Sequence, residues 1–267
     1  MACKAVVLTA TSSNHWLESL DALASVQNMM PDIKIIMMDL GMDAAQAEQL
    51  KRLVNVEVRK FPFDSFPPHV RRLEVFAWKS LSMQMMLSEY EVVFYMDASI
   101  RLRRPLVDIL IPAVQKFPIK VNGNGMYDGA FTREETYKYL GVTRKQVSKR
   151  CQKEGGLQMY RNCSFLHERI LSALVDCALH EECIAPSGSS PYGCDMDKYR
   201  RQMHQIDTIE QFEYIGCHRF DQSAMTSVLE REFHFADQHP AVSPQAFLQS
   251  LVVWRYPTKC YTLFLKN

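Results

Sequence analysis

The chain has 267 residues, 47% of them hydrophobic and 23% charged, and its formal net charge at pH 7 is +1. This length suits one large α/β domain or two small ones, and the composition is that of a protein with a substantial core. The near-neutral charge gives no sign of a nucleic-acid-binding surface. No stretch reaches the roughly 18 consecutive apolar residues of a membrane-spanning helix, and the first residues lack the basic head and long apolar core of a signal peptide.

Apolar strands and amphipathic helices alternate along the first hundred residues. Continuous apolar runs predict strands over residues 5–8, 33–38 and 92–96, and a further strand is predicted over 56–61. Apolar residues at helical spacing predict helices over residues 14–29, 44–53 and 73–88. Strands that alternate with helices form a mostly parallel sheet covered by helices, so we expect an α/β fold.

The pattern is weaker beyond residue 100. Sequences that match capping boxes at Thr132 and Thr143 predict two short helices. The remaining predicted elements are a strand over 157–160 after Gly155 and Gly156, helices over 165–179 and 221–232, and a strand over 251–254. No internal repeat or linker is present. We therefore expect one domain over residues 1–267, with a nucleotide-binding half (1–100) and an active-site half (101–267).

The fourth predicted strand ends on a carboxylate, Asp97. A buried carboxylate is costly unless it is paired, hydrogen-bonded or bound to a metal, and open α/β sheets bind ligands at the carboxyl ends of their strands. In an extended chain Ser99, Arg101 and Arg103 would share one face. This arrangement suits the diphosphate of a nucleotide sugar. The alternative is that the arginines neutralise Asp97 or lie solvated at a sheet edge.

The order of these elements, with Trp78-Lys79 on the helix before a strand that ends in Asp-x-small, resembles the glycosyltransferases of GT-A fold. More closely, four segments resemble an animal family of glycosyltransferase-like proteins over roughly residues 5–229: FAWKSLSMQMMLSEYEVVFYMDASIRL, GGLQMYRN, VDCALHEECIAP and CHRFDQSAMTSVL. The resemblance implies a mixed, mostly parallel GT-A sheet. It also implies transfer of a sugar from a nucleotide-diphosphate donor, such as a uridine diphosphate (UDP) sugar, to an acceptor that the sequence does not identify.

The segment RFDQSAMTSVL is similar to the Asp-Gln region of the glycogenin-like retaining transferases. This resemblance implies that Asp221 and Gln222 are catalytic, lie beside the anomeric carbon of the donor and act with retention of configuration. The alternative is that Asp221 only caps the helix that starts there.

The metal-binding Asp-x-Asp motif of the GT-A enzymes reads here as Asp97-Ala98-Ser99. A serine hydroxyl is a poorer ligand for Mg²⁺ or Mn²⁺ than a carboxylate. One interpretation is that a further side chain completes a metal site on Asp97, the candidates being His218, His234 and Asp237. Another is a metal-independent enzyme in which cations, namely Lys79, Arg101 and Arg103, offset the diphosphate charge. A third is that catalysis has been lost.

Four further positions are candidates for ligand contacts. Ser12 and Asp39 follow the first two strands, where the nucleotide would lie, although capping and surface termination explain them equally well. Gly155 and Gly156 would let a sugar approach the backbone, or would simply form a turn. With His218 they are the candidates for the acceptor region.

Eight cysteines are present, six of them between residues 151 and 217, and no pair has CxxC spacing. They are either scattered thiols or one or two disulfides, of which Cys177–Cys183 is the first candidate. Disulfides would place the protein in the secretory lumen, in the Golgi or endoplasmic reticulum, and reduced thiols in the cytoplasm.

We therefore expect a glycosyltransferase. The alternative is an inactive GT-A-like domain that binds a nucleotide or acts as a scaffold. A nucleotidyltransferase ranks last, because the TATSSN segment after the first strand lacks the glycine-rich, basic loop of that class.

Overall fold

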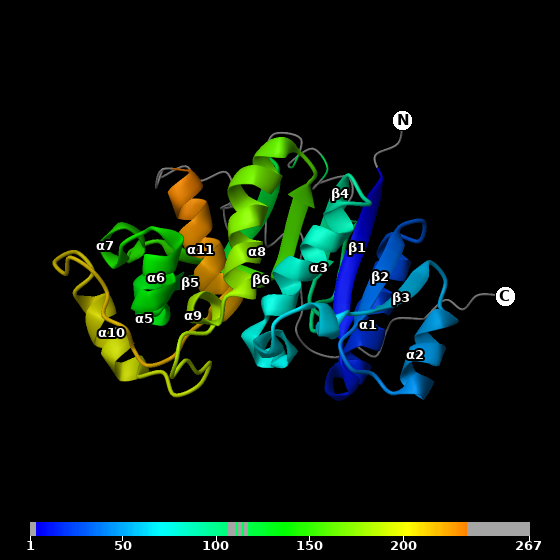
Figure 1. The fold of residues 1–267 in the computed structure, drawn as a ribbon, viewed down its shortest axis with the longest axis horizontal. Coiled ribbons are helices and arrows are strands. Elements are labelled where there is room, and N and C mark those ends of the chain that lie inside the picture. Colours follow the sequence, from blue (N-terminus) through cyan, green and yellow to red (C-terminus); the bar gives the residue numbers. More distant parts are fainter. Residues whose placement is uncertain (1–3, 106–110, 112–113, 115–116, 234–267) are drawn as a thin grey trace.

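The computed structural model describes residues 4–105, 111, 114 and 117–233 (Figure 1). The predicted strand over 251–254 and the candidate ligands His234 and Asp237 lie outside these residues. No helix within the described part of the chain is both long enough and apolar enough to cross a membrane.

A six-stranded sheet in the order β3-β2-β1-β4-β6-β5 forms the centre of the molecule. β6 runs antiparallel to both of its neighbours, and the other pairs are parallel. The strands are β1 (Ala5–Thr11), β2 (Lys34–Asp39), β3 (Val56–Lys60), β4 (Val92–Met96), β5 (Ile119–Tyr127) and β6 (Cys151–Arg161). The expected α/β class with a mixed, mostly parallel sheet is confirmed.

Helices cover both faces of the sheet. The helices that follow strands in the first half are α1 (Trp16–Met29), α2 (Ala44–Lys51) and α3 (Ala77–Leu87). The second half contains α5 (Asp128–Phe131), α6 (Glu134–Leu140), α7 (Arg144–Val147), α8 (Ser172–Leu179), α9 (Glu181–Ile184), α10 (Met196–His204) and α11 (Phe220–Glu232). Figure 1 shows α10 with α5, α6 and α7 at one end of the molecule and α2 at the other.

Alternate residues of the buried strands enter two separate cores. In β1, Val6 and Leu8 pack with α3, α8 and α11, whereas Val7 packs with α1 on the opposite face. In β4, Tyr95 faces the first of these cores and Phe94 the second. The period of two along a strand places successive side chains on opposite faces, and continuous apolar runs therefore predict strands that are covered on both sides.

Two local predictions in the second half are wrong. Gly155 and Gly156 do not form a turn but lie inside β6, which begins at Cys151. Thr132 does not cap α6, whose N-cap position is Arg133, because its hydroxyl donates to Asp128 Oδ1 at 3.0 Å. The capping box at Thr143 is confirmed, since Thr143 and Gln146 exchange both of its hydrogen bonds at the start of α7.

Candidate functional site

A pocket of about 420 Å³ opens at the carboxyl ends of β1 and β4. Its lining combines the turn after β1, the start of α3 and the residues that follow β4, including Ser12, Trp78, Asp97 and Ser99. This is the edge at which open α/β sheets bind ligands. The structure thus brings three of the predicted donor-binding residues, Ser12, Asp97 and Ser99, to one pocket.

Asp97 is held by backbone and side chain at this edge. Its backbone N–H donates to the carbonyl oxygen of Gly156 at 2.8 Å, which extends the pairing of β4 with β6. The hydroxyl of Tyr95 donates to Asp97 Oδ1 at 2.5 Å. Burial, followed by the charge of Asp97, raises the pKa of Tyr95 well above its usual value, so this hydroxyl remains a donor. The side chain of Asp97 is 27% exposed, and it is therefore accessible to a ligand.

Behind Asp97 lies the buried ammonium group of Lys79. Its Nζ atom is 3.0 Å from Asp97 Oδ1 and 3.3 Å from Asp221 Oδ2, and it donates to the carbonyl oxygen of Gly155 at 3.1 Å. The rings of Phe76 and Tyr95 lie 4.6 and 5.2 Å from the same nitrogen. Two carboxylates thus share one cation, which leaves a formal charge of −1 when all three groups are ionised.

The pKa values of the lysine and Asp221 shift in the same direction. Burial lowers the pKa of Lys79, but the charges of Asp221 and Asp97 outweigh it, and the net shift is upward. For Asp221, burial raises the pKa, and the opposite charge of Lys79 only partly offsets this rise. Lys79 therefore remains charged, and its ammonium group stabilises the carboxylate of Asp97 at the pocket.

The start of α3 fixes where Lys79 points. Phe76, the N-cap residue, has a φ of 58°, a left-handed conformation that is uncommon for a non-glycine residue. The indole of Trp78 donates to the carbonyl oxygen of Leu73 at 3.1 Å across this turn. Trp78 belongs to the core on this face of the sheet and Phe76 packs against that core, while the Lys79 side chain reaches Asp97 and Asp221.

Gly155 is required by close packing rather than by its backbone angles. A Cβ atom at this position would lie 2.6 Å from Asp221 Oδ2 and 3.3 Å from the side chain of Gln222. Only glycine lets β6 approach α11 this closely. The predicted residues Gly155, Asp221 and Lys79 therefore form one cluster, although they come from three different elements.

Asp221 is not the cap of α11. The N-cap position is Arg219, and the carboxylate of Asp221 points to Lys79 instead. Its Oδ2 atom accepts no hydrogen bond in the described residues, so the ion pair is its compensation. The neighbouring Gln222 accepts a hydrogen bond from Asn124 Nδ2 at 2.9 Å. Neither Asp221 nor Gln222 is among the described residues that line the pocket.

Arg101 lies away from the pocket. The chain after Asp97 is not extended but turns, with Ile100 N–H donating to Asp97 O at 3.0 Å, and this turn separates Ser99 from Arg101. The Arg101 guanidinium is 2% exposed, donates to Ala98 O and Ile100 O, and lies 3.5 Å from Asp21 of α1. Arg101 is therefore a buried structural residue on the α1 face of the sheet, where it binds backbone carbonyl oxygens and Asp21.

Two further predicted residues have backbone partners. Asp39 Oδ1 accepts the N–H groups of Gly41 and Met42 at 2.8 and 2.7 Å, at the end of β2. His218 is fully buried, with Nε2 3.2 Å from Ile184 O. Burial lowers the pKa of His218 to about 4, and the imidazole is neutral at pH 7. Neither residue is among the described residues that line the pocket.

The described residues include no group of three or more His, Cys, Asp and Glu side chains arranged to hold a metal ion. The contacts of Asp97 with Tyr95 and Lys79 both use Oδ1 rather than Oδ2. One carboxylate is enough where a Mg²⁺ ion takes its other ligands from phosphate oxygens and water. The donor set thus fits a metal that arrives with a nucleotide diphosphate, and it does not fit a closed protein site.

Sequence reasoning missed several residues of the pocket, and two of them also line the cavity next to it. Glu74 lies on the short turn before α3, and Tyr192 lies on the loop after α9. Tyr192 is 79% exposed, unusual for a large aromatic side chain. Glu74 falls at the start of the helix predicted over 73–88 and Tyr192 in a loop, and neither segment carries a pattern that indicates a ligand contact.

Two disulfides join cysteines of the second half. They are Cys177–Cys183, the first candidate from the sequence, and Cys194–Cys217. Among the described cysteines Cys151 and Cys163 are free.

The model of a protein family of unknown function (DUF1647) matches residues 2–84, less than half of the chain. No curated protein matches the chain.

Solved structures of glycosyltransferases resemble the fold of this chain. An active-site mutant of LgtC is 16% identical, with a TM-score of 0.47, over 66% of this chain and 64% of that one. The bifunctional glycosyltransferase WbbM is 10% identical, with a TM-score of 0.49, over 88% of this chain and 52% of that one.

Mouse xyloside xylosyltransferase 1 is 11% identical, with a TM-score of 0.47, over 98% of this chain and 97% of that one. The chain spans less than two thirds of the LgtC and WbbM structures. Similarity at this level assigns neither an activity nor a donor or acceptor.

Proposed function

We propose that this protein is a glycosyltransferase that binds a nucleotide-diphosphate sugar, a UDP sugar in the first instance, in the pocket beside Asp97. The observation that carries the proposal is the placement of Asp97. It lies at the carboxyl end of a central strand and lines the pocket, and a buried lysine and a tyrosine hydroxyl hold it from behind. Its resemblance to the first carboxylate of the Asp-x-Asp motif supports the same role.

The charge of the pocket favours a donor that carries a divalent cation. Its described lining contains three carboxylates, Glu18, Glu74 and Asp97, and no lysine or arginine. The imidazole of His15 lies 3.0 Å from Glu18. A diphosphate alone would be repelled by these carboxylates. We therefore propose that Mn²⁺ or Mg²⁺ enters with the donor and is held by Asp97 Oδ2, with Ser99 beside it.

When bound, the metal would neutralise the diphosphate as a leaving group. Lys79 pairs with Asp97 at the edge of the pocket, and Asp221 fixes the position of Lys79. Gln222 lies beside Gly155. We propose retention of configuration because Asp221-Gln222 resembles the Asp-Gln pair of the glycogenin-like retaining transferases. Nuclear magnetic resonance of the newly formed anomeric proton checks this last point.

The test is calorimetric titration of UDP into the protein with Mn²⁺ and then with a chelator, combined with an assay for UDP release from a panel of UDP sugars. We expect binding that requires Mn²⁺ and slow release of UDP. Asp97→Ala should abolish both and leave the circular dichroism spectrum unchanged. Asp207→Asn, on an exposed turn, is the matched control and should behave as the parent protein. UDP release that survives Asp97→Ala would refute the proposal.

The second candidate is a domain that binds the nucleotide without turnover. The serine at the third position of Asp97-Ala98-Ser99 favours it, because one carboxylate of the motif is missing. In that case UDP would bind with Mn²⁺, but no donor in the panel would be consumed.

A further inference from the structure

A second cavity, of about 680 Å³, adjoins the donor pocket. It lies between the turn before α3 and the loop that follows α9, residues 185–192, called the serine-proline loop below. Glu74 and Tyr192 line both cavities. A molecule in the second cavity would therefore lie directly against a donor bound beside Asp97.

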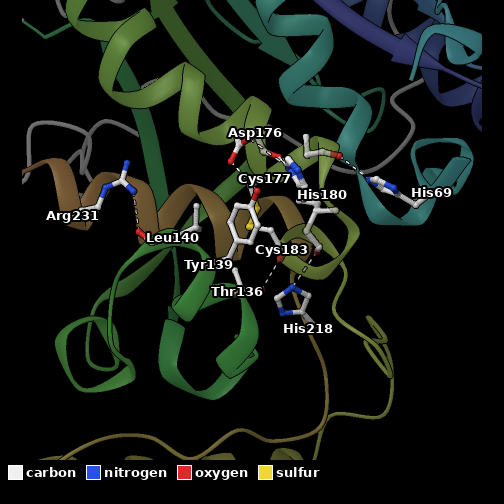
Figure 2. Close-up of a disulfide and its surroundings, with 12 residues drawn as sticks. His69, Thr136, Tyr139, Leu140, Asp176, Cys177, His180, Cys183, His218 and Arg231 are labelled. Carbon is white, nitrogen blue, oxygen red and sulfur yellow. Dashed lines mark hydrogen bonds and ion pairs between the residues drawn. A yellow bond between two sulfur atoms is a disulfide. The ribbon is translucent and has the colours of Figure 1, made fainter. Parts of the chain in front are cut away.

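Each end of the serine-proline loop is anchored by its own disulfide. Cys177–Cys183 precedes it and Cys194–Cys217 follows it. At its start, the hydroxyl of Thr136 donates to Cys183 O at 2.7 Å, and His218 Nε2 lies 3.2 Å from Ile184 O (Figure 2). These contacts come from α6 and from the segment before α11. The loop is thus held in place before any ligand arrives, which lowers the entropic cost of binding.

The side chains of the second cavity indicate what it would bind. Glu74, Glu181 and Glu182 line it, with Arg72 as the single basic residue of its described lining, and Arg72 is already paired with Glu181. The remaining lining is rich in serine and proline. Carboxylates and hydroxyls in excess over cations suit a neutral, hydroxyl-rich ligand and repel an anionic one.

Tyr192 supplies an exposed aromatic surface to this cavity. Its ring is 79% exposed at the junction of the two cavities, and its backbone N–H donates to Ser190 Oγ at 3.0 Å. A tyrosine offers a rigid flat surface at a low cost in conformational entropy, with a hydroxyl at its end. The face of a sugar ring, which carries C–H groups, can pack on such a surface.

We infer that the second cavity is the acceptor site of the proposed transferase and that it takes a neutral carbohydrate, with Tyr192 as its platform. This inference rests on the proposed function. An acceptor hydroxyl oxygen would bond to the anomeric carbon as the bond from that carbon to the diphosphate breaks. The nucleoside diphosphate leaves, and the hydroxyl proton passes to its terminal phosphate oxygen.

The first test needs no donor and no turnover. Saturation-transfer difference spectra are recorded for the intact protein with neutral disaccharides and with the matching disaccharides in which the terminal ring is a uronic acid. We expect signals for neutral sugars and little or none for the acids. Tyr192→Ala should weaken binding about tenfold, equivalent to roughly 1.4 kcal/mol. Phe165→Ala, which removes another partly exposed aromatic ring, is the control and should have no effect.

The second test reverses charge. Glu182→Lys should raise the signal of the uronic acids relative to the neutral sugars, and in the UDP-release assay it should shift acceptor stimulation in the same direction. Equal binding of both sugar classes, or binding that Tyr192→Ala leaves unchanged, overturns the inference. If neutral sugars bind through Tyr192 but UDP does not bind at all, the proposed function fails and the carbohydrate site remains.

Discussion

The ammonium nitrogen of Lys79 lies 3.3 Å from Oδ2 of Asp221, and both side chains are only 7% exposed. This pair joins α3 to the first turn of α11, and through Asp97 it reaches the donor pocket. A buried charge is costly unless it is paired. The cluster therefore couples the stability of the fold to the electrostatics of the proposed active site.

Removing the cation should be strongly destabilising. Lys79→Met leaves two carboxylates facing each other without compensation, and we expect a loss of about 3–5 kcal/mol in the free energy of unfolding. Urea denaturation followed by circular dichroism measures it. Lys51→Met breaks an exposed pair with Glu48 and should cost under about 1 kcal/mol. Adding Asp221→Asn to Lys79→Met should recover part of the loss, whereas additive losses would contradict the described pairing.

A methyl group at position 155 should disturb the same cluster. Gly155→Ala places its Cβ atom against Asp221 Oδ2, so the carboxylate must move away from Lys79. We expect a loss of about 1–3 kcal/mol in stability and weaker Mn²⁺-dependent UDP binding. In an Asp221→Ala background the substitution should be much better tolerated, because the clashing atom is gone. Equal costs in both backgrounds would show that the contact with Asp221 is not the cause.

Loss of the Cys194–Cys217 disulfide should impair the use of an acceptor more than the binding of the donor. Cys194 and Cys217 are 23 positions apart, and opening a loop of that size typically costs about 3 kcal/mol. Cys194→Ser with Cys217→Ser should lower acceptor-stimulated UDP release much more than UDP affinity, because Tyr192 is the only residue of the serine-proline loop in the described donor pocket, whereas the whole loop lines the second cavity. Cys151→Ser, at a free cysteine, is the control. A matching loss of UDP affinity would contradict this separation.

Two buried groups should give opposite pH dependences of stability. Burial raises the pKa of Asp128 to about 6 from 3.8, so its protonated form is favoured in the native state and its contribution is lost as the pH rises from about 4 to 6. Burial lowers the pKa of His218 to about 4 from 6.5, so its contribution is lost as the pH falls through the same range. Each is worth about 3 kcal/mol, and together they nearly cancel.

Variants should reveal the two contributions separately. In Asp128→Asn the free energy of unfolding should rise more steeply between pH 4 and 6 than in the parent protein, and in His218→Gln it should fall with pH relative to the parent. The measurement is urea denaturation at several pH values. Glu210→Gln, at an exposed carboxylate, serves as the control. Parallel curves for the parent and both variants would contradict the assigned shifts.

The first half of the fold could be predicted from the sequence because its signals are local. The apolar runs that became β1, β2 and β4 enter both cores and therefore carry no polar alternation. β5 was not predicted, since Ile119–Tyr127 contains Gly123, Gly125 and two asparagines. Its pairing with β6 is irregular, and such a strand is stabilised by its neighbour rather than by its own composition.

The site could be predicted only in part. Asp97 was found because a charge ended a buried strand. The pairing of Lys79 with Asp221 was not predicted, because no local sequence pattern indicates which distant side chain pairs with a buried charge. Arg101 was misplaced for a related reason: the turn after Asp97 depends on a hydrogen bond from Ile100 N–H, and an extended chain was assumed.

The charge cluster draws Lys79, Asp97, Gly155 and Asp221 from widely separated parts of the chain. Contacts between residues so far apart form late in folding, because the cost of closing long loops must be met first. An unfinished chain that ends before α11 would contain all six described strands and still leave Lys79 without Asp221. Competence to bind the proposed donor should thus appear only after α11 has packed on the sheet, and UDP binding would report that step.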